Sequence, residues 1–177
     1  MKKLITTLSI VLLFSGCAEQ LYLSSDFDRT ADFSTYKTYA LAKDQEKPGN
    51  TSPMFDNELN RKRIKEAIEK EMKSMGLAQS DWEPDLLIDF HITIDQQTDY
   101  IVHNNYPFRY RYWPSYDVAS YTFKKGALVI HIVDTKKEQL VWQGVGSKRL
   151  DDVPPRDLEA KIQEAVKAIF SQYPNRR

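Results

Sequence analysis

The sequence predicts an α+β domain, a two-layer sandwich in which two amphipathic helices cover one face of a mainly antiparallel sheet. Apolar and polar residues alternate over 86–95, which indicates a half-buried strand. Apolar residues recur at helical spacing over 57–75 and again towards the end of the chain, over 154–173. Because each helix has a single apolar face, both are expected to pack on the apolar face of the sheet.

The remaining elements follow from local composition. In order, we expect a strand at 22–28, a strand at 36–41, a loop at 42–55, a helix at 57–75, strands at 86–95, 126–134 and 140–145, a loop at 146–153 and a helix at 154–173. Asp56 is expected to cap the N-terminus of the first helix, and Gly76 follows its last turn. Pro154 and Pro155 suit the start of the second helix.

The first sixteen residues have the order of a secretory signal. Lys2 and Lys3 precede the largely apolar run 4–14, and small residues follow it. This run is about eleven residues long, whereas a membrane-spanning helix needs roughly 20. We therefore expect a signal peptide at 1–16 rather than a transmembrane anchor.

The signal ends at the only cysteine of the chain, Cys17. The run Phe14-Ser15-Gly16-Cys17 resembles a bacterial lipobox, after which the cysteine thiol carries diacylglycerol. An exported protein with one cysteine has no intramolecular disulfide partner, so lipidation gives Cys17 a role; an ordinary signal with a chance cysteine is the alternative. Several acyl chains, palmitate among them, would hold the protein at a membrane. Ala18 in place of Asp favours the outer membrane, with the domain expected to face the periplasm.

Residues 17–21 would then form an acylated tether, and 22–175 a single domain of sufficient length to bury a core. Lys+Arg and Asp+Glu are balanced at 25 each, and the loss of Lys2 and Lys3 with the signal makes the mature chain slightly acidic. A nucleic-acid partner is therefore not expected.

An aromatic insert at 98–123 is the most unusual part of the sequence. The expected interaction surface within it is Phe108, Arg109, Tyr110, Arg111, Tyr112 and Trp113. Alternation of aromatic and cationic residues suits an extended strand, and Tyr, Trp and Arg dominate binding hot spots. The alternative is a long hairpin or loop whose aromatic residues cover the domain's own sheet.

Catalytic or metal-binding groups do not form a recognisable motif. His91 and His131 could face each other across paired strands and hold zinc with Asp89 or Asp95, although side chains on a solvated strand face explain them more simply. The acidic residues Asp26, Asp28 and Asp32 could bind calcium, but their spacing is not that of an EF-hand and favours turn capping. Asp151 and Asp152 suit a helix start. With no GxSxG elbow or glycine-rich phosphate loop, we expect no catalytic residues, metal or cofactor.

Several segments together resemble a family of bacterial lipoproteins known as domain of unknown function 4136. The segments are Ser25-Asp26-Phe27-Asp28, Asp32-Phe33-Ser34-Thr35-Tyr36-Lys37-Thr38-Tyr39, Pro84-Asp85-Leu86-Leu87-Ile88, the strand from Gly126 to Asp134, and Leu140-Val141-Trp142-Gln143-Gly144. The resemblance covers most of 22–173, and the aromatic insert departs from it. It implies a lipid-anchored envelope protein and assigns no functional residue beyond Cys17.

The leading hypothesis is a non-catalytic envelope lipoprotein, a binding or assembly subunit whose partner is the membrane through Cys17 and another envelope protein. The second is a lipoprotein that binds a glycan or a lipid in a cleft between the sheet and the insert. The third is a metal-dependent hydrolase centred on His91 and His131.

Overall fold

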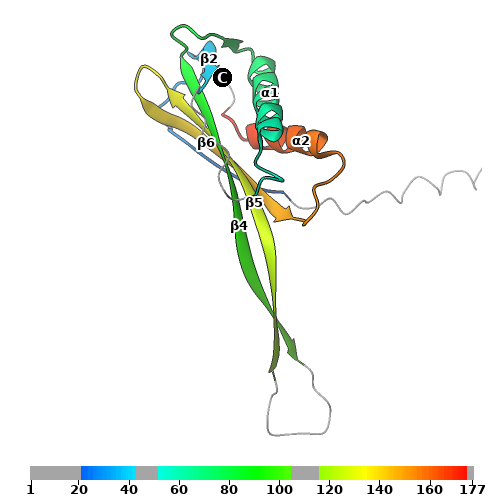
Figure 1. Cartoon of the computed structure of the whole chain (residues 1–177). Coiled ribbons are helices and arrows are strands. Elements are labelled where there is room, and N and C mark those ends of the chain that lie inside the picture. Colours follow the sequence, from blue (N-terminus) through cyan, green and yellow to red (C-terminus); the bar gives the residue numbers. More distant parts are fainter. Residues whose placement is uncertain (1–20, 43–51, 105–115, 175–177) are drawn as a thin grey trace, which may run out of the picture.

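The computed structural model describes residues 21–42, 52–104 and 116–174, with the backbone alone given for 100–104 and 116–119. Figure 1 shows one sheet, two helices beside it and a long hairpin that projects away from both. The expected α+β sandwich is confirmed, since a six-stranded, mostly antiparallel sheet carries both helices.

The strand order in the sheet is β1-β6-β5-β4-β2-β3. The strands are β1 (Tyr22–Phe27), β2 (Thr38–Leu41), β3 (Ala78–Gln79), β4 (Leu86–Asn104), β5 (Tyr116–Asp134) and β6 (Gln139–Leu150). Four strands, β1, β6, β5 and β4, pair antiparallel, whereas β2 pairs parallel with both β4 and β3. The chain therefore forms a β4–β5–β6 meander, and one edge is completed by the N-terminal strand.

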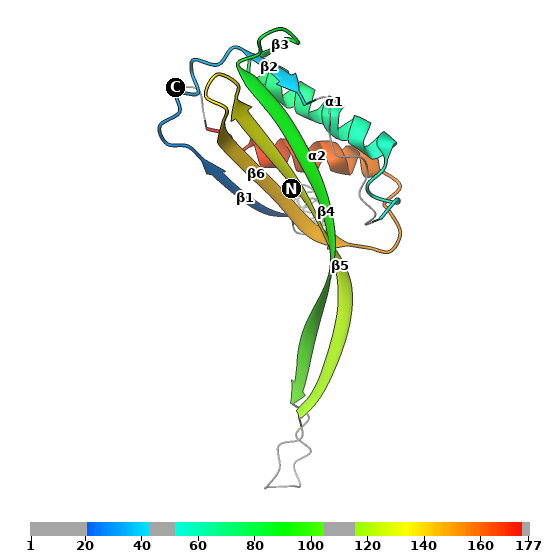
Figure 2. The same ribbon diagram turned by 60° about the vertical axis from the view of Figure 1, so that its left-hand side comes forward.

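Both helices lie on the same side of the sheet, as Figure 2 shows. They are α1 (Glu58–Ser74) and α2 (Leu158–Phe170). The expected stripe of α1 is buried at Ile64, Ala67, Ile68 and Met72. Gly76 adopts a positive φ of 79° just after the helix, a conformation that glycine tolerates best. Neither helix in the described part of the chain combines the length and apolar character needed to cross a membrane.

The core lies between this layer of helices and the inner face of the sheet. Alternate positions of β4 and β5 contribute Leu86, Ile88, Phe90, Ile130 and Ile132, which are fully buried. An aromatic cluster closes the end near the C-terminus: Trp142 stacks on Phe170 with ring centroids 5.4 Å apart, and Tyr173 and Phe33 extend it by edge contacts.

Several expected element boundaries are wrong. The strand expected at 86–95 extends to Asn104, and the strand expected at 126–134 begins at Tyr116, because the two strands continue as a paired hairpin. The loop expected at 146–153 starts only after Leu150, since β6 pairs with β5 through that residue. The final helix begins at Leu158 rather than at Pro154 and ends at Phe170.

The expected cap of α1 is also corrected. Asn57, not Asp56, is the N-cap, and its side-chain oxygen accepts a hydrogen bond of 3.0 Å from the backbone N–H of Asn60. Asp56 is buried and forms a two-point ion pair with Arg61, at 2.6 Å to Nε and 2.9 Å to Nη2. A buried charge needs such a partner, which explains why Asp56 faces inwards instead of capping.

Candidate functional site

A two-stranded arm projects from the sheet where β6 ends. The last β5–β6 pair is Lys124 with Leu150, and beyond it β4 and β5 pair only with each other, for eight residue pairs from Gln97↔Phe123 to Asn104↔Tyr116. We call these two segments, 97–104 and 116–123, the arm. At about 3.4 Å per residue it is roughly 25 Å long. Figures 1 and 2 both show it extending clear of the helices.

At its base, the arm has one aromatic face and one polar face. On the aromatic face, the guanidinium of Arg149 lies 4.6 Å from the ring centroid of Phe123 and 5.3 Å from that of Tyr121. The Tyr121 hydroxyl donates to Asp99 at 3.3 Å. These aromatic residues of the insert therefore pack against a neighbouring side chain of the same domain, as the hairpin alternative expected.

The outer edges of the arm have no strand partner among the described residues. On β4, pairing with β2 covers only Leu86 to Ile88, so the outer backbone edge from Asp89 to Asn104 has no described strand beside it. The first N–H beyond this pairing, that of Phe90, donates to the Asp89 side chain at 2.8 Å. An unpaired edge offers hydrogen-bonding groups to a strand from another chain.

The two histidines lie side by side on the sheet face opposite the helices. The rings of His91 and His131 are 5.3 Å apart, as expected if their strands pair. Each ring has its own partner: His91 Nε2 lies 3.1 Å from Asp89 Oδ2, and His131 Nε2 lies 3.0 Å from Gln143 Oε1. No group of three His, Cys, Asp or Glu side chains suited to a metal occurs in the described part of the chain. The zinc hypothesis gains no support from this geometry.

The acidic residues near the first turn cap the backbone. Asp28 accepts from the hydroxyl and the N–H of Thr30, and Asp32 does the same for Ser34. These hydrogen bonds hold the pKa of both carboxyls below the usual value, and the bond from the hydroxyl has the largest effect. Such local bonds are typical of Asx turns and favour the turn-capping interpretation over calcium binding.

Two further carboxylates join distant segments of the chain. Asp134 is buried, and although burial opposes its ionisation, hydrogen bonds from the Lys137 N–H and the Tyr36 hydroxyl keep its pKa below the usual value. The pKa of Tyr36 is raised chiefly by its burial and, to a lesser extent, by its hydrogen bond to Asp134. Asp85 has its pKa lowered to about 2, chiefly by the backbone N–H of Lys37. Both carboxylates thus hold segments of the sheet together through hydrogen bonds to residues distant in the sequence.

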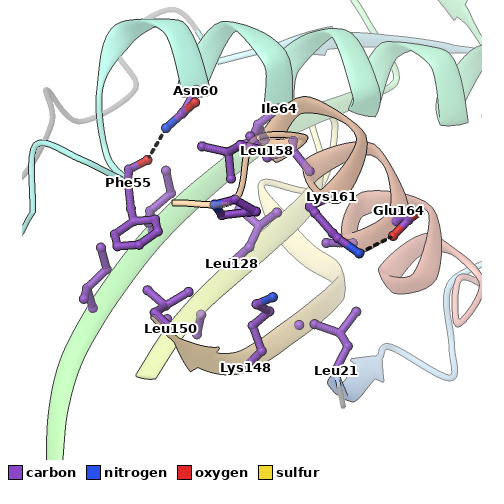
Figure 3. A pocket seen from close by; sticks show the side chains of 18 of the residues that line it. Leu21, Phe55, Asn60, Ile64, Leu128, Lys148, Leu150, Leu158, Lys161 and Glu164 are labelled. Atoms are coloured by element: carbon purple, nitrogen blue, oxygen red, sulfur yellow. Dashed lines mark hydrogen bonds and ion pairs between the residues drawn. The ribbon is translucent and has the colours of Figure 1, made fainter. Parts of the chain in front are cut away.

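A pocket of about 370 Å³ opens between the inner face of the sheet and the two helices. It lies near the base of the arm, since Gly126 and Leu150 are among its lining residues, and side chains of both helices line it as well (Figure 3). Its apolar lining includes Leu21, Ile64, Ile92, Ile94, Leu128, Leu150, Leu158 and Ile162. The volume lies within the range of small-molecule sites, about 300–1,000 Å³. This pocket is lined by the sheet and helices, not by the sheet and the insert as the second hypothesis expected.

The polar side chains of the pocket are engaged mainly with protein atoms. Asn60 donates to the Phe55 carbonyl at 2.9 Å, and Lys161 pairs with Glu164 at 3.7 Å, both drawn in Figure 3. Lys148 is the other cation of the lining. A lining with few free polar groups suits a hydrocarbon ligand better than a sugar, whose hydroxyls would lose water without gaining partners.

The residues that the sequence singled out are only partly placed. Cys17 and the expected interaction surface Phe108–Trp113 lie outside the described residues. Sequence reasoning missed the pocket altogether, because its walls come from β4, β5, β6, α1 and α2 and no local pattern marks them. Only small residues at positions such as Gly126, Gly146 and Ala165 hint at it.

Comparisons with known proteins identify the fold. The model of the family described as Domain of unknown function (DUF4136) matches residues 23–175. No curated protein gives a significant match. A PDZ domain protein of Parabacteroides distasonis is 20% identical with a TM-score of 0.55, over 88% of this chain and 36% of that chain. A DUF4136 family protein of Bacteroides thetaiotaomicron is 18% identical with a TM-score of 0.53, over 90% of this chain and 98% of that chain. This chain thus spans little more than a third of the PDZ domain protein, and both likenesses are of fold.

Proposed function

Because this chain belongs to the DUF4136 family, we propose that it is a lipid-anchored protein of the bacterial cell envelope that binds a partner protein and carries out no catalysis. Cys17, at the end of a signal-like segment, is the attachment site in this proposal, and the outer membrane is its location. The binding role rests on a single observation, the projecting arm with its unpaired edges.

The arm is difficult to explain as structure alone. A two-stranded ribbon is marginally stable in water at best, because it buries little apolar surface. Yet the arm continues for eight residue pairs beyond the last strand that supports it. Its described side chains are largely polar at the base, with Gln97, Thr98 and Thr122 exposed. A long hairpin with unpaired backbone edges and polar side chains at its base is suited to pair with a strand of another envelope protein.

The sequence between the two halves of the arm adds specificity to this proposal. Residues 108–113 are Phe-Arg-Tyr-Arg-Tyr-Trp, the residue types that carry most binding energy at protein interfaces. Open edges supply backbone hydrogen bonds to any extended partner, whereas aromatic and arginine side chains select one partner. The polar sheet face with His91 and His131 is the weaker candidate, because those side chains already pair with Asp89 and Gln143.

Photo-crosslinking in living cells tests the binding proposal. A photoreactive amino acid replaces Thr98 on the arm, or Tyr110 beyond it, and the control position is the exposed Lys73 in the last turn of α1. We expect discrete adducts of one mass from Thr98 and Tyr110 and none from Lys73. The same adducts from all three positions, or none from any in a chain that reaches the membrane, would contradict a binding role for the arm.

A separate experiment tests the anchor. Cells labelled with palmitate should incorporate it into the wild-type chain and not into the Cys17→Ser variant, which should also leave the membrane fraction. Equal labelling of the two chains, or a Cys17→Ser variant that stays at the membrane, would refute lipid attachment at Cys17.

A further inference from the structure

We propose that the pocket between the sheet and the helices holds one of the acyl chains attached to Cys17. This inference rests on the proposed lipidation and adds a site for the lipid on the protein itself. The occupant is a named part of this chain, located just before its first described residue, and three observations support it.

The first observation is the chemistry of the lining. The wall residues are overwhelmingly apolar, and of the polar side chains Asn60 and Lys161 already have partners within the protein. A hydrocarbon chain needs no hydrogen bonds, so it fills such a pocket without leaving buried polar groups unpaired. Exposed concave apolar surface on a small domain is unfavourable unless it is covered.

The second observation is the position of Leu21. This residue lines the pocket and immediately precedes β1, whose pairing with β6 fixes it there. The first described residue of the chain is therefore part of the pocket wall. A segment of four residues, 17–20, separates Leu21 from the end of the signal-like segment. Fully extended, four residues span at most about 14 Å.

The third point is the high local concentration of the acyl chain at the pocket. A group held by so short a tether is presented to the pocket at an effective concentration on the order of millimolar, far above that of any free lipid in an aqueous compartment. A mature lipoprotein carries several chains, and two suffice for stable attachment to the bilayer. One chain can therefore occupy the pocket without loss of the anchor, and it would hold the domain close to the membrane surface in a fixed orientation.

Thiol accessibility tests this proposal in native membranes, without detergent that could itself fill the pocket. Cys17 is the only cysteine of the chain, and acylation blocks its thiol. A cysteine introduced by Ala165→Cys on the pocket side of α2 is then the only free thiol, and Ala160→Cys, exposed on the same helix and outside this pocket, is the matched control. Ala168→Cys, a second position in the lining, serves if the first variant fails to fold.

Each cysteine variant is made in two full-length chains. One is acylated at Cys17; the other carries Cys17→Ala and is held at the same membrane by an uncleaved transmembrane helix in place of the signal. We expect a maleimide to label Ala165→Cys at least tenfold more slowly in the acylated chain than in the helix-anchored chain. The labelling rate of Ala160→Cys should be the same in both.

The other outcomes are separable. Protection of Ala165→Cys in both chains would mean that bilayer lipid or the membrane surface covers the pocket, and would overturn the inference. Equal, rapid labelling in a chain that incorporates palmitate would leave the pocket open and overturn it as well. Absence of palmitate from the wild-type chain would instead refute the proposed lipid anchor. Metabolic labelling with palmitate measures this independently of the reactivity of the introduced thiol.

Discussion

Asp85 offers the sharpest test of how the sheet is held together. Its carboxylate lies at the start of β4 and accepts from the N–H groups of Lys37 and Thr38, at 2.9 and 3.1 Å, and from the Thr38 hydroxyl at 3.1 Å. Lys136, in the turn between β5 and β6, adds an ion pair at 3.1 Å. One side chain thus joins three parts of the sheet. Substitution by asparagine keeps its size and removes its charge.

The magnitude follows from the pKa. The hydrogen bond from Lys37 is the main cause that lowers the pKa of Asp85 from 3.8 to about 2. At 1.36 kcal/mol per pH unit, ionised Asp85 contributes about 2 kcal/mol to stability at neutral pH. The carboxylate is 21% exposed, so solvent screening removes little of this. Because the folded-state pKa is the lower one, the contribution is complete above pH 4 and disappears as the pH falls towards 2.

Urea unfolding of the soluble Cys17→Ser chain and its Asp85→Asn derivative, followed by tryptophan fluorescence at several pH values, measures this difference. We expect Asp85→Asn to lower the free energy of unfolding by about 2 kcal/mol at pH 7, with the gap closing between pH 4 and pH 2. Other carboxylates titrate equally in both proteins, so their effects cancel. The exposed Asp151→Asn is the control. If the two chains differ in free energy of unfolding by the same amount at pH 7 and pH 2, the charge of Asp85 has no role. If they do not differ at pH 7, the Asp85 side chain does not stabilise the sheet.

Two further substitutions test the core. Asp56→Ala leaves the buried Arg61 without its ion-pair partner and should lower the free energy of unfolding by about 3–5 kcal/mol. Asp56→Asn should lower it less, and urea unfolding measures both variants. An Asp56→Ala variant of wild-type stability would contradict the importance of the buried ion pair. Gly144→Ala places a Cβ atom 2.3 Å from the Trp142 ring and should lower the free energy of unfolding by about 1–3 kcal/mol. The displaced ring should also change the near-ultraviolet circular dichroism spectrum. Wild-type stability with an unchanged spectrum would contradict this close packing.

The fold was largely predictable because most elements bury a regular pattern. Alternation from Leu86 to Ile94 and the stripe of α1 follow directly from the need to cover apolar faces, and no distant residue is required to recognise them. The arm was foreseen only as one alternative, a long hairpin or loop, since Gln96 to Asp99 are exposed and polar and give no pattern that favours a strand. Only their pairing with Thr122 and its neighbours makes them a strand. The predicted cap of α1 was wrong for a different reason: Asp56 pairs with Arg61, five residues further along the chain, and so does not cap the helix.

The same limits explain why β6 was assigned too short and the pocket not at all. Gly146 resembles a loop residue locally, although it lies within β6. A Cβ atom at Gly144 or Gly146 would lie 2.5 or 2.9 Å from Ile169, so the two glycines allow α2 to pack closely on this strand. At Gly126 a Cβ atom would lie 2.8 Å from Leu150, which lines the pocket.

Small residues thus serve two purposes on this face. Gly144 allows close packing of α2 where the aromatic cluster lies, and towards the arm small residues such as Gly126 and Ala165 leave the pocket unfilled. A sequence selected for stability alone would fill that space with larger side chains. A bulky apolar residue at Ala168 should therefore stabilise the domain if the pocket is normally empty. If an acyl chain of Cys17 occupies it, the gain should appear in the soluble Cys17→Ser chain and vanish in the acylated one, because there the new side chain only replaces hydrocarbon that is already buried.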